Sequence, residues 1–167
     1  MLFNFLIILG FNFVVITILW LSSLKTRRAD FIDIYWGPSF LFSFMLVLVI
    51  NNSFSMTEII LLFLITIWGF RLGIYLLIRN INKTEDIRYV KIREARGDIG
   101  LYLTAYLIQI ILIPIISLPL ISILDTSIGI SFMHWVGILM ALLGILIETI
   151  ADAQLSNFKL DQKNIGK

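Results

Sequence analysis

The chain has 167 residues, of which 59% are hydrophobic and only 14% are charged, and its formal net charge is +2. A soluble domain is about half apolar and about a quarter charged, so this composition is typical of an integral membrane protein. The small net charge excludes a strong field for nucleic acid. The absence of cysteine excludes disulfides and thiolate metal sites, and a single histidine cannot build a histidine zinc site. We therefore predict no metal centre.

Five apolar stretches predict five membrane-spanning helices. Four of them lack any charged side chain, and the other is interrupted only by Arg71. They cover residues 1–24, 34–57, 59–78, 99–124 and 126–147. Each reaches the roughly 20 residues with which a helix crosses a bilayer core. Pro114 and Pro119 lie inside the fourth stretch and predict a kink or a re-packed turn there.

The basic residues predict the orientation of these spans, because lysine and arginine favour the cytoplasmic side. They gather after the first span, between the third and the fourth, and after the fifth, whereas the connections at residues 51–57 and 125–131 carry none. We therefore expect the N-terminus outside and the C-terminus in the cytoplasm. The prediction is an all-α, multi-pass protein of the bacterial inner membrane, with residues 1–167 forming one domain.

The only sizeable soluble element is expected at residues 80–98. Residues 85–96 predict a short helix that has Thr84 as its N-cap, acidic residues in its first turn and Gly97 at its end.

Two carboxylates lie where the last apolar stretch ends. Glu148 and Asp152 are four residues apart, so a helix places them on one face. Arg71 is expected at a similar depth in the cytoplasmic half. Ionisable groups at membrane depth face a bundle interior, a polar cavity or a partner. Two interpretations stay open: a structural ion pair between Arg71 and Glu148, and a cavity in which Arg71 binds an anion or a carbonyl group.

The polar residues that follow Glu148 also allow two interpretations. Asp152, Gln154, Asn157 and Lys159 carry the groups that bind a cofactor's hydroxyls, amides and phosphates. On residue types alone we prefer the other interpretation, an ordinary polar helix end, where lysine is favoured near the C-terminus.

Four pieces of the sequence resemble bacterial membrane proteins related to the steroid 5α-reductases, a branch described as a domain of unknown function. The most specific piece is Glu148 with Ala151-Asp152-Ala153-Gln154-Leu155, Phe158-Lys159 and Asn164-Ile165-Gly166-Lys167. The others are Asp33-Ile34-Tyr35-Trp36-Gly37, then Arg71 with the segment from Glu85 to Glu94, then Gln109 with Ser117-Leu118-Pro119-Leu120. They occur in the family's order along the whole chain.

The resemblance implies a helical membrane fold that binds NADPH from the cytoplasmic side and reduces a carbon–carbon double bond next to a carbonyl group. The substrate would be a lipid-like small molecule taken from the bilayer. By resemblance, Asp152 contacts the nucleotide, and Glu148, Asn157 and Lys159 join it on the cofactor side. Negative charge grows on the carbonyl oxygen during such a reduction, so a hydrogen-bond donor or a cation must stabilise it.

The sequence departs from the steroid reductases on the substrate side. Those enzymes carry a Gln-Glu pair before a Pro-Ser-Phe, whereas Tyr35-Trp36 precede Gly37-Pro38-Ser39-Phe40 here. The tyrosine shortly before their third-span arginine corresponds to Trp68. We therefore assign the catalytic side to Tyr35, Arg71 and Tyr75, with the phenols of Tyr35 and Tyr75 as substitute donors.

The chain stops at Lys167, where family members continue into a nucleotide-binding segment, so we expect a fragment or a shortened relative. Two other classes are retained as alternatives. One is a membrane methyltransferase similar to the isoprenylcysteine methyltransferases, which would use S-adenosylmethionine. The other is a non-catalytic membrane scaffold whose charges only join helices.

Overall fold

The computed structural model describes residues 1–81, 83–124 and 129–160, and every regular element among them is helical. Within these residues five segments are long and apolar enough to cross a membrane. They are Leu2–Thr26, Phe31–Asn51, Met56–Asn80, Ile87–Ile121 and Phe132–Lys159. The prediction of an all-α, multi-pass membrane protein with five spans is therefore confirmed. The predicted motif residues Asn164 to Lys167 lie outside the described residues.

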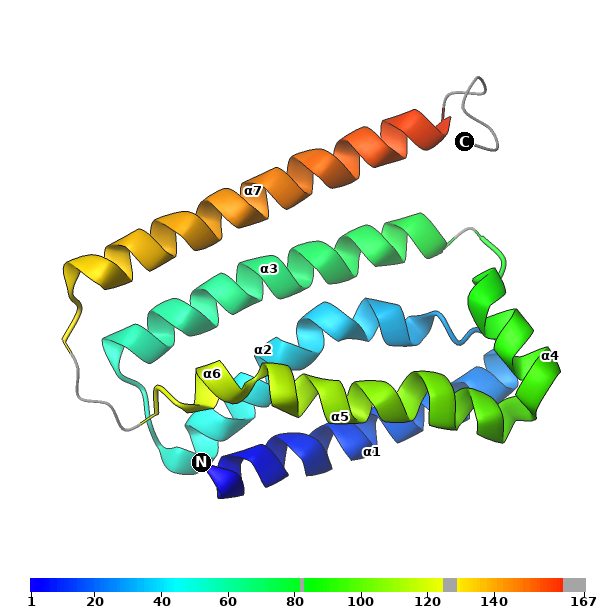
Figure 1. The fold of residues 1–167 in the computed structure, drawn as a ribbon, viewed down its shortest axis with the longest axis horizontal. Coiled ribbons are helices and arrows are strands. Elements are labelled where there is room, and N and C mark those ends of the chain that lie inside the picture. Colours follow the sequence, from blue (N-terminus) through cyan, green and yellow to red (C-terminus); the bar gives the residue numbers. More distant parts are fainter. Residues whose placement is uncertain (82, 125–128, 161–167) are drawn as a thin grey trace. The chain divides into compact units, whose positions relative to one another are not determined.

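The chain divides into two compact units, Met1–Ser127 and Ile128–Lys167. The first unit contains α1 (Leu2–Thr26), α2 (Phe31–Asn51) and α3 (Met56–Asn80), followed by α4 (Ile87–Leu101), η1 (Tyr102–Tyr106), α5 (Leu107–Ile116) and α6 (Leu118–Ile121). Within it, α2 packs against α1 and α3, and α1 packs against α5 (Figure 1). The second unit consists of α7 (Phe132–Leu160). The prediction of one domain stays a prediction.

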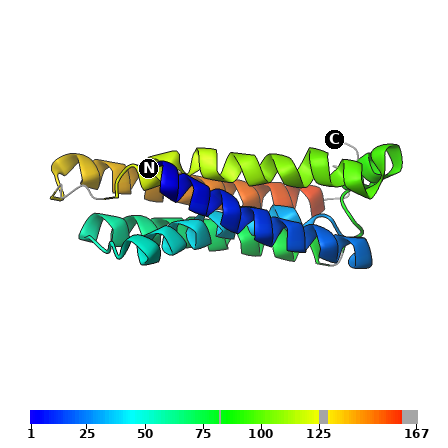
Figure 2. The same cartoon turned by 90° about the horizontal axis from the view of Figure 1, so that it is seen from below.

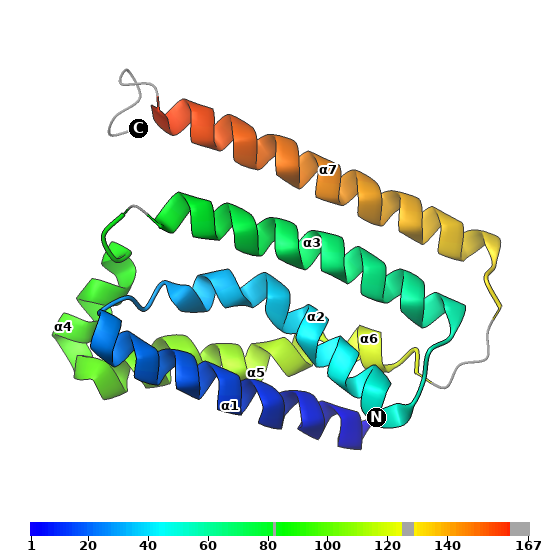
Figure 3. The same ribbon diagram turned by 180° about the vertical axis from the view of Figure 1, so that it is seen from behind.

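Small residues bring α2 and α3 into close contact. A Cβ atom added at Gly37 would lie 2.5 Å from the carbonyl oxygen of Gly69, so neither position has space for a side chain. Gly73 lies against the ring of Pro38, which α2 carries in its interior. In a membrane, such close backbone approach replaces the hydrophobic driving force that helices have in water. The two helices run side by side in the view from behind (Figure 3).

Polar side chains join α1 to α2 at membrane depth. The fully buried amide of Asn12 donates from Nδ2 to Ser43 Oγ over 2.8 Å and to Ile8 O over 2.9 Å. Its Oδ1 accepts the hydroxyl of Tyr35 at 3.1 Å. Near the other end of the helices, Asn51 Nδ2 donates to Asn4 Oδ1 over 2.9 Å. A buried amide is costly without partners, and these contacts satisfy it.

The predicted short helix begins two residues later than expected. Asp86, rather than Thr84, is the N-cap of α4, and its carboxylate accepts the backbone N–H of Arg88 at 2.9 Å. Glu85 lies before the helix because its carboxylate binds Arg93 and the backbone N–H of Ala29. The predicted end is correct in kind: Gly97 has φ +69° and breaks the helical path inside α4.

The fourth span is irregular. After Gly97 the chain forms the π-helical turn η1 and then α5, which contains Pro114 and ends at Ile116. Ser117 separates α5 from α6, whose first turn contains Pro119. The predicted effect of the two prolines is therefore confirmed as a re-packed turn. Figure 2 shows α1 running obliquely beside α5, with α2 and α3 in the layer below.

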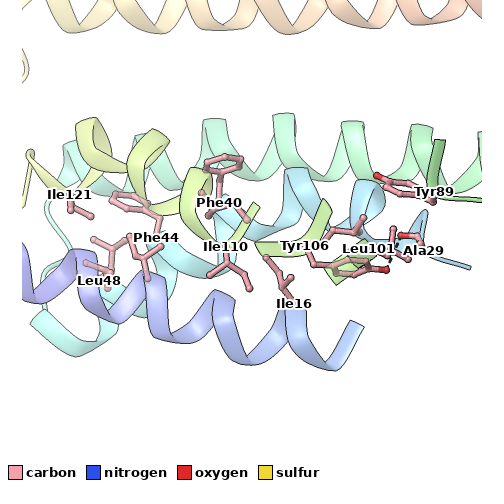
Figure 4. Packing of buried hydrophobic residues seen from close by; sticks show 14 of the residues in the cluster. Ile16, Ala29, Phe40, Phe44, Leu48, Tyr89, Leu101, Tyr106, Ile110 and Ile121 are labelled. Carbon is pink, nitrogen blue, oxygen red and sulfur yellow. Dashed lines mark hydrogen bonds between the residues drawn. The ribbon is translucent and has the colours of Figure 1, made fainter. Parts of the chain in front are cut away.

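The core of the first unit lies among α1, α2, η1 and α5. Ile16, Phe44, Tyr106 and Ile110 are almost fully buried there (Figure 4). Many other apolar side chains of these helices are exposed, as lipid-facing positions require, since bilayer tails solvate them. The helix α3 therefore packs against the rest of the first unit mainly through α2.

Candidate functional site

A groove of about 600 Å³ opens in the first unit, between α3 on one side and η1 with α5 on the other. Residues of α2 and α4 complete its lining. This volume lies within the range of about 300–1,000 Å³ that is usual for sites binding one small molecule. The lining residues are Asp33, Trp36, Leu72, Leu76, Arg79, Arg88, Tyr89, Ile92, Thr104, Ala105, Ile108, Gln109 and Leu112.

Most of the groove wall is apolar. Leu72 and Leu76 are one turn apart on α3, and Ile108 and Leu112 are one turn apart on α5. In each pair the spacing of four residues places both side chains on one helix face. The indole ring of Trp36 lies on α2, with its centroid 5.4 Å from that of Phe40. The wall is therefore suited to a hydrocarbon ligand.

The charged side chains of the groove gather at one end, where α2 begins, α3 ends and α4 begins; we call it the basic end. Both carboxylate oxygens of Asp33 accept hydrogen bonds there. Its Oδ1 accepts the hydroxyl of Tyr89 at 2.6 Å, and its Oδ2 accepts Arg88 Nη2 at 3.1 Å. Arg88 also binds both carboxylate oxygens of Asp86, at 3.0 and 2.9 Å. The hydrogen bond from Arg88 holds the pKa of Asp86 below its usual value.

Arg79 is the other cation at the basic end. It is half-buried in the last turn of α3, and its guanidinium carbon lies 5.7 Å from the centroid of the Tyr75 ring. Its Nε donates to Asn80 Oδ1 over 3.3 Å. Within the part of the chain that the structure describes, no carboxylate forms an ion pair with it, in contrast to Arg88. Its charge is therefore less compensated than that of Arg88.

Gln109 contributes a polar atom to the apolar wall. Its Oε1 is buried and has no hydrogen-bond partner among the residues that the structure describes. A buried amide oxygen without a partner is destabilising, typically by about 1–3 kcal/mol, so its retention invites an explanation. Nearby Thr104 is different, because its hydroxyl donates to Gly100 O over 2.6 Å.

A second cluster fixes α4 at the basic end. Arg93 forms a bidentate pair with Glu85, and its Nε lies 3.1 Å from Asp98 Oδ1. Arg28 binds both carboxylate oxygens of the buried Asp30, at 2.8 and 2.7 Å, and this hydrogen bonding raises the pKa of Arg28. These groups all have partners within the first unit. We therefore interpret the cluster as a structural connection among α1, α2 and α4.

The residues predicted for the catalytic side do not share one environment. Tyr35 points its hydroxyl at Asn12 of α1, and its neighbour Trp36 lines the groove instead. Arg71 and Tyr75 are half-buried and lie one turn apart on α3. The Tyr75 ring lies beside the guanidinium of Arg79. The catalytic roles of Tyr35, Arg71 and Tyr75 stay predictions.

The residues predicted for the cofactor side all lie on α7, in the second unit. Asp152 is half-buried, whereas Glu148, Asn157 and Lys159 are exposed. Glu148 and Asp152 have the predicted spacing of one helical turn. The predicted cavity shared with Arg71 would combine both units, and it stays a prediction.

The residues of the basic end were not predicted from the sequence as a group. Asp33, Arg79, Arg88 and Tyr89 come from three helices, and each lies in the first or last turn of its helix. That position was the available signal, because ends of successive spans on the same membrane side lie close together. Asp33 and Arg88 were noticed only as parts of a resembling motif, without a role.

Comparisons with known proteins identify the family but add no named relative. A search of curated proteins and a search of solved structures each gave no match. Residues 19–167 match the family described as "Protein of unknown function (DUF1295)". This match covers most of the chain, including the groove and the polar end of α7. The chain is therefore a multi-pass membrane protein that belongs to the DUF1295 family.

Proposed function

We propose that the protein is a membrane-embedded, NADPH-dependent reductase of an activated carbon–carbon double bond in a lipid-soluble substrate. The observation that carries this proposal is the groove, whose apolar wall lies within the membrane-spanning helices and whose charged end joins three of them. Such a site favours a lipid that carries one polar group. The chemistry is supported by the resemblance of the sequence motifs to those of the steroid 5α-reductases, and the match to DUF1295 spans the residues that carry these motifs.

The donor set on α7 fits a dinucleotide. Asp152 supplies a carboxylate for ribose hydroxyls, Asn157 an amide, and Lys159 an ammonium group for a phosphate, all within about two turns of one helix. Bound NADPH would supply a hydride to the carbon β to the carbonyl group, and a proton from solvent would add to the α carbon. Glu148, one turn before Asp152, would complete the cofactor side.

The groups that this chain would offer to the reacting carbonyl group are donors on α3 and α2, and none of them is among the residues that line the groove. Arg71 can hold a cation at the carbonyl oxygen, where negative charge grows as the double bond is reduced. Tyr75 can donate its phenolic proton from the same helix. Tyr35 can do so only by exchanging its hydrogen bond with Asn12 for one with the substrate.

The test is NADPH binding to the purified full-length protein in a neutral detergent, measured by the quenching of tryptophan fluorescence. We expect saturable binding that Asp152→Ala weakens by about tenfold or more, the usual cost of losing a hydrogen bond to a charged group. Glu94→Ala is the matched control, since it removes an exposed carboxylate from α4.

Two further titrations distinguish the alternatives. Binding of S-adenosylmethionine in place of NADPH would favour a methyltransferase. If neither nucleotide binds, and neither raises the thermal stability by mass action, the scaffold interpretation replaces the enzyme. Arg71→Ala and Glu148→Ala would then lower only the stability.

A further inference from the structure

We propose that the groove binds a single lipid with an anionic head group, which is held by Arg79 at the basic end while its chain follows α3 and α5. The inference rests on the proposed function only in treating this lipid as the reductase's substrate. The binding itself is a property of the first unit, and it requires no nucleotide.

The charges of the groove lining favour an anion. Two arginines, Arg79 and Arg88, and one carboxylate, Asp33, line it. Both oxygens of Asp33 already accept hydrogen bonds, from Tyr89 and from Arg88. Because Arg88 pairs with it, the charge of Asp33 is already partly compensated within the protein.

The two arginines differ in what they can offer a ligand. Arg88 has two carboxylate partners, Asp33 and Asp86. Among the described residues, Arg79 forms no ion pair, and its contacts are the amide oxygen of Asn80 and the face of Tyr75. Asp33 and Asp86 attract it only over a longer distance. A half-buried guanidinium that forms no ion pair can bind an anion, and its planar donors match a carboxylate or a phosphate.

The position of Arg79 also fits a lipid. It lies at the basic end, which is the end predicted to face the cytoplasm, where head groups meet the protein. Leu76 and Leu72 continue from it along α3, so the apolar wall extends roughly 10 Å from the cation into the membrane. Ile108 and Leu112 lie opposite on α5. A ligand with a charge at one end and a hydrocarbon chain at the other satisfies both parts.

Gln109 adds a hydrogen-bond acceptor between the apolar side chains of the groove, since its Oε1 has no partner among the residues that the structure describes. Gln109 follows Ile108 on α5, between the apolar side chains of the wall. This oxygen is enclosed by the protein, so the Gln109 side chain must turn toward the groove before a hydroxyl group on the lipid chain can satisfy it. We therefore expect a hydroxylated acidic lipid to bind more tightly than its unsubstituted counterpart.

The binding experiment uses cis-parinaric acid, a fluorescent long-chain fatty acid, and its methyl ester, with the full-length chain in a neutral maltoside detergent. The two share the same hydrocarbon chain, and the ester replaces the ionised carboxylate by an uncharged methyl ester. We expect the affinity for the acid to exceed that for the ester by about tenfold or more, because a hydrogen bond to a charged group contributes that factor to binding. Arg79→Gln should abolish the difference, and Arg79→Lys should retain part of it.

Lys83→Gln is the matched control. It removes one positive charge four residues beyond Arg79, from an exposed side chain that does not line the groove. Its preference for the acid should equal that of the unchanged protein. A second variant, Leu72→Trp, places a larger side chain in the apolar part of the groove. It should weaken the binding of the acid and of the ester equally. It tests the location of the chain independently of any effect that Arg79→Gln has on folding.

Three results would overturn the proposal. The first is equal affinity for the acid and the ester. The second is an equal loss of the preference for the acid in Lys83→Gln and Arg79→Gln. The third is displacement of the acid by inorganic phosphate at concentrations that do not alter the detergent micelles. The last would assign Arg79 to a free anion or a nucleotide phosphate. Saturable acid binding together with absent NADPH binding would retain the lipid site and reject the reductase, so the two proposals fail separately.

Discussion

The hydroxyl of Tyr89 on α4 donates to Oδ1 of Asp33 on α2 over 2.6 Å. The two residues are 56 positions apart in the sequence, and their contact joins the first turn of a membrane span to the first turn of the connecting helix. Tyr89 is almost fully buried, so this hydrogen bond is shielded from water. It closes the basic end of the groove.

Removing the Tyr89 hydroxyl tests this contact. We expect Tyr89→Phe to lower the free energy of unfolding by about 1–2 kcal/mol, because Asp33 loses one of its two partners while the ring still packs. Unfolding in mixed micelles, followed by circular dichroism, measures the change. Tyr75→Phe is the control, since within the described residues the Tyr75 hydroxyl has no hydrogen bond. Equal losses in the two variants would contradict the role of the contact.

The crossing of α2 and α3 should tolerate no side chain. We expect Gly69→Ala to destabilise the protein by about 1–3 kcal/mol, the usual effect of overpacking, because its Cβ would lie 2.7 Å from Gly37 O. Gly10→Ala on α1 has nothing within 4 Å of the added Cβ and should be nearly neutral. The thermal unfolding midpoints of the two variants measure the difference. A stable Gly69→Ala protein would show that the helices separate easily.

The buried amide of Asn12 should couple α1 to α2. We expect Asn12→Leu to cost about 0.5–2 kcal/mol, as for other hydrogen bonds between membrane helices, because it leaves the hydroxyls of Tyr35 and Ser43 without this partner. Tyr35→Phe in the same background should then have almost no further effect. A double-mutant cycle on unfolding free energies measures this coupling. Strictly additive losses would mean that the two side chains act independently.

The N-cap of α4 should make stability depend on pH in the acid range. Arg88 lowers the pKa of Asp86 in the folded state relative to the unfolded state. The carboxylate therefore contributes stability above its unfolded pKa of about 4, and this contribution is lost as the pH falls through the lower folded value. Asp86→Asn keeps a capping side chain without the charge.

Thermal unfolding in a nonionic detergent between pH 6 and pH 3 measures this effect. The midpoint of the unchanged protein should fall more steeply on acidification than that of Asp86→Asn. Parallel curves would show that other carboxylates dominate the acid response, and that the ion pair with Arg88 contributes little.

The sequence alone predicted the spans because their signal is local. Runs of apolar residues of bilayer length need no knowledge of neighbouring helices, and the re-packed turn near Pro114 followed from the chemistry of proline alone. The start of α4 was misplaced for the opposite reason. Glu85 has a distant partner in the backbone of Ala29, and only the folded chain brings the two together.

The candidate site was harder to predict than the fold. In the sequence, charged residues within or beside apolar runs, such as Arg71 and Glu148, indicate a site most strongly, because such residues are rare in membrane spans. The residues at the basic end are ordinary for helix termini, and only their convergence gives them significance. Gln109 was noticed as part of a motif, but its unpartnered oxygen is a property of the packed structure.

The π-helical turn at Tyr102–Tyr106 determines which side chains α5 presents to the groove. A π-turn accommodates one residue more than an α-helical turn, and one residue corresponds to a rotation of about 100° around the helix axis. Deleting a single residue from this turn would therefore rotate Ile108, Gln109 and Leu112 together by about this angle, away from their present positions in the groove. Relatives that lack the extra residue would line the same cleft with a different set of side chains, and so accept different molecules.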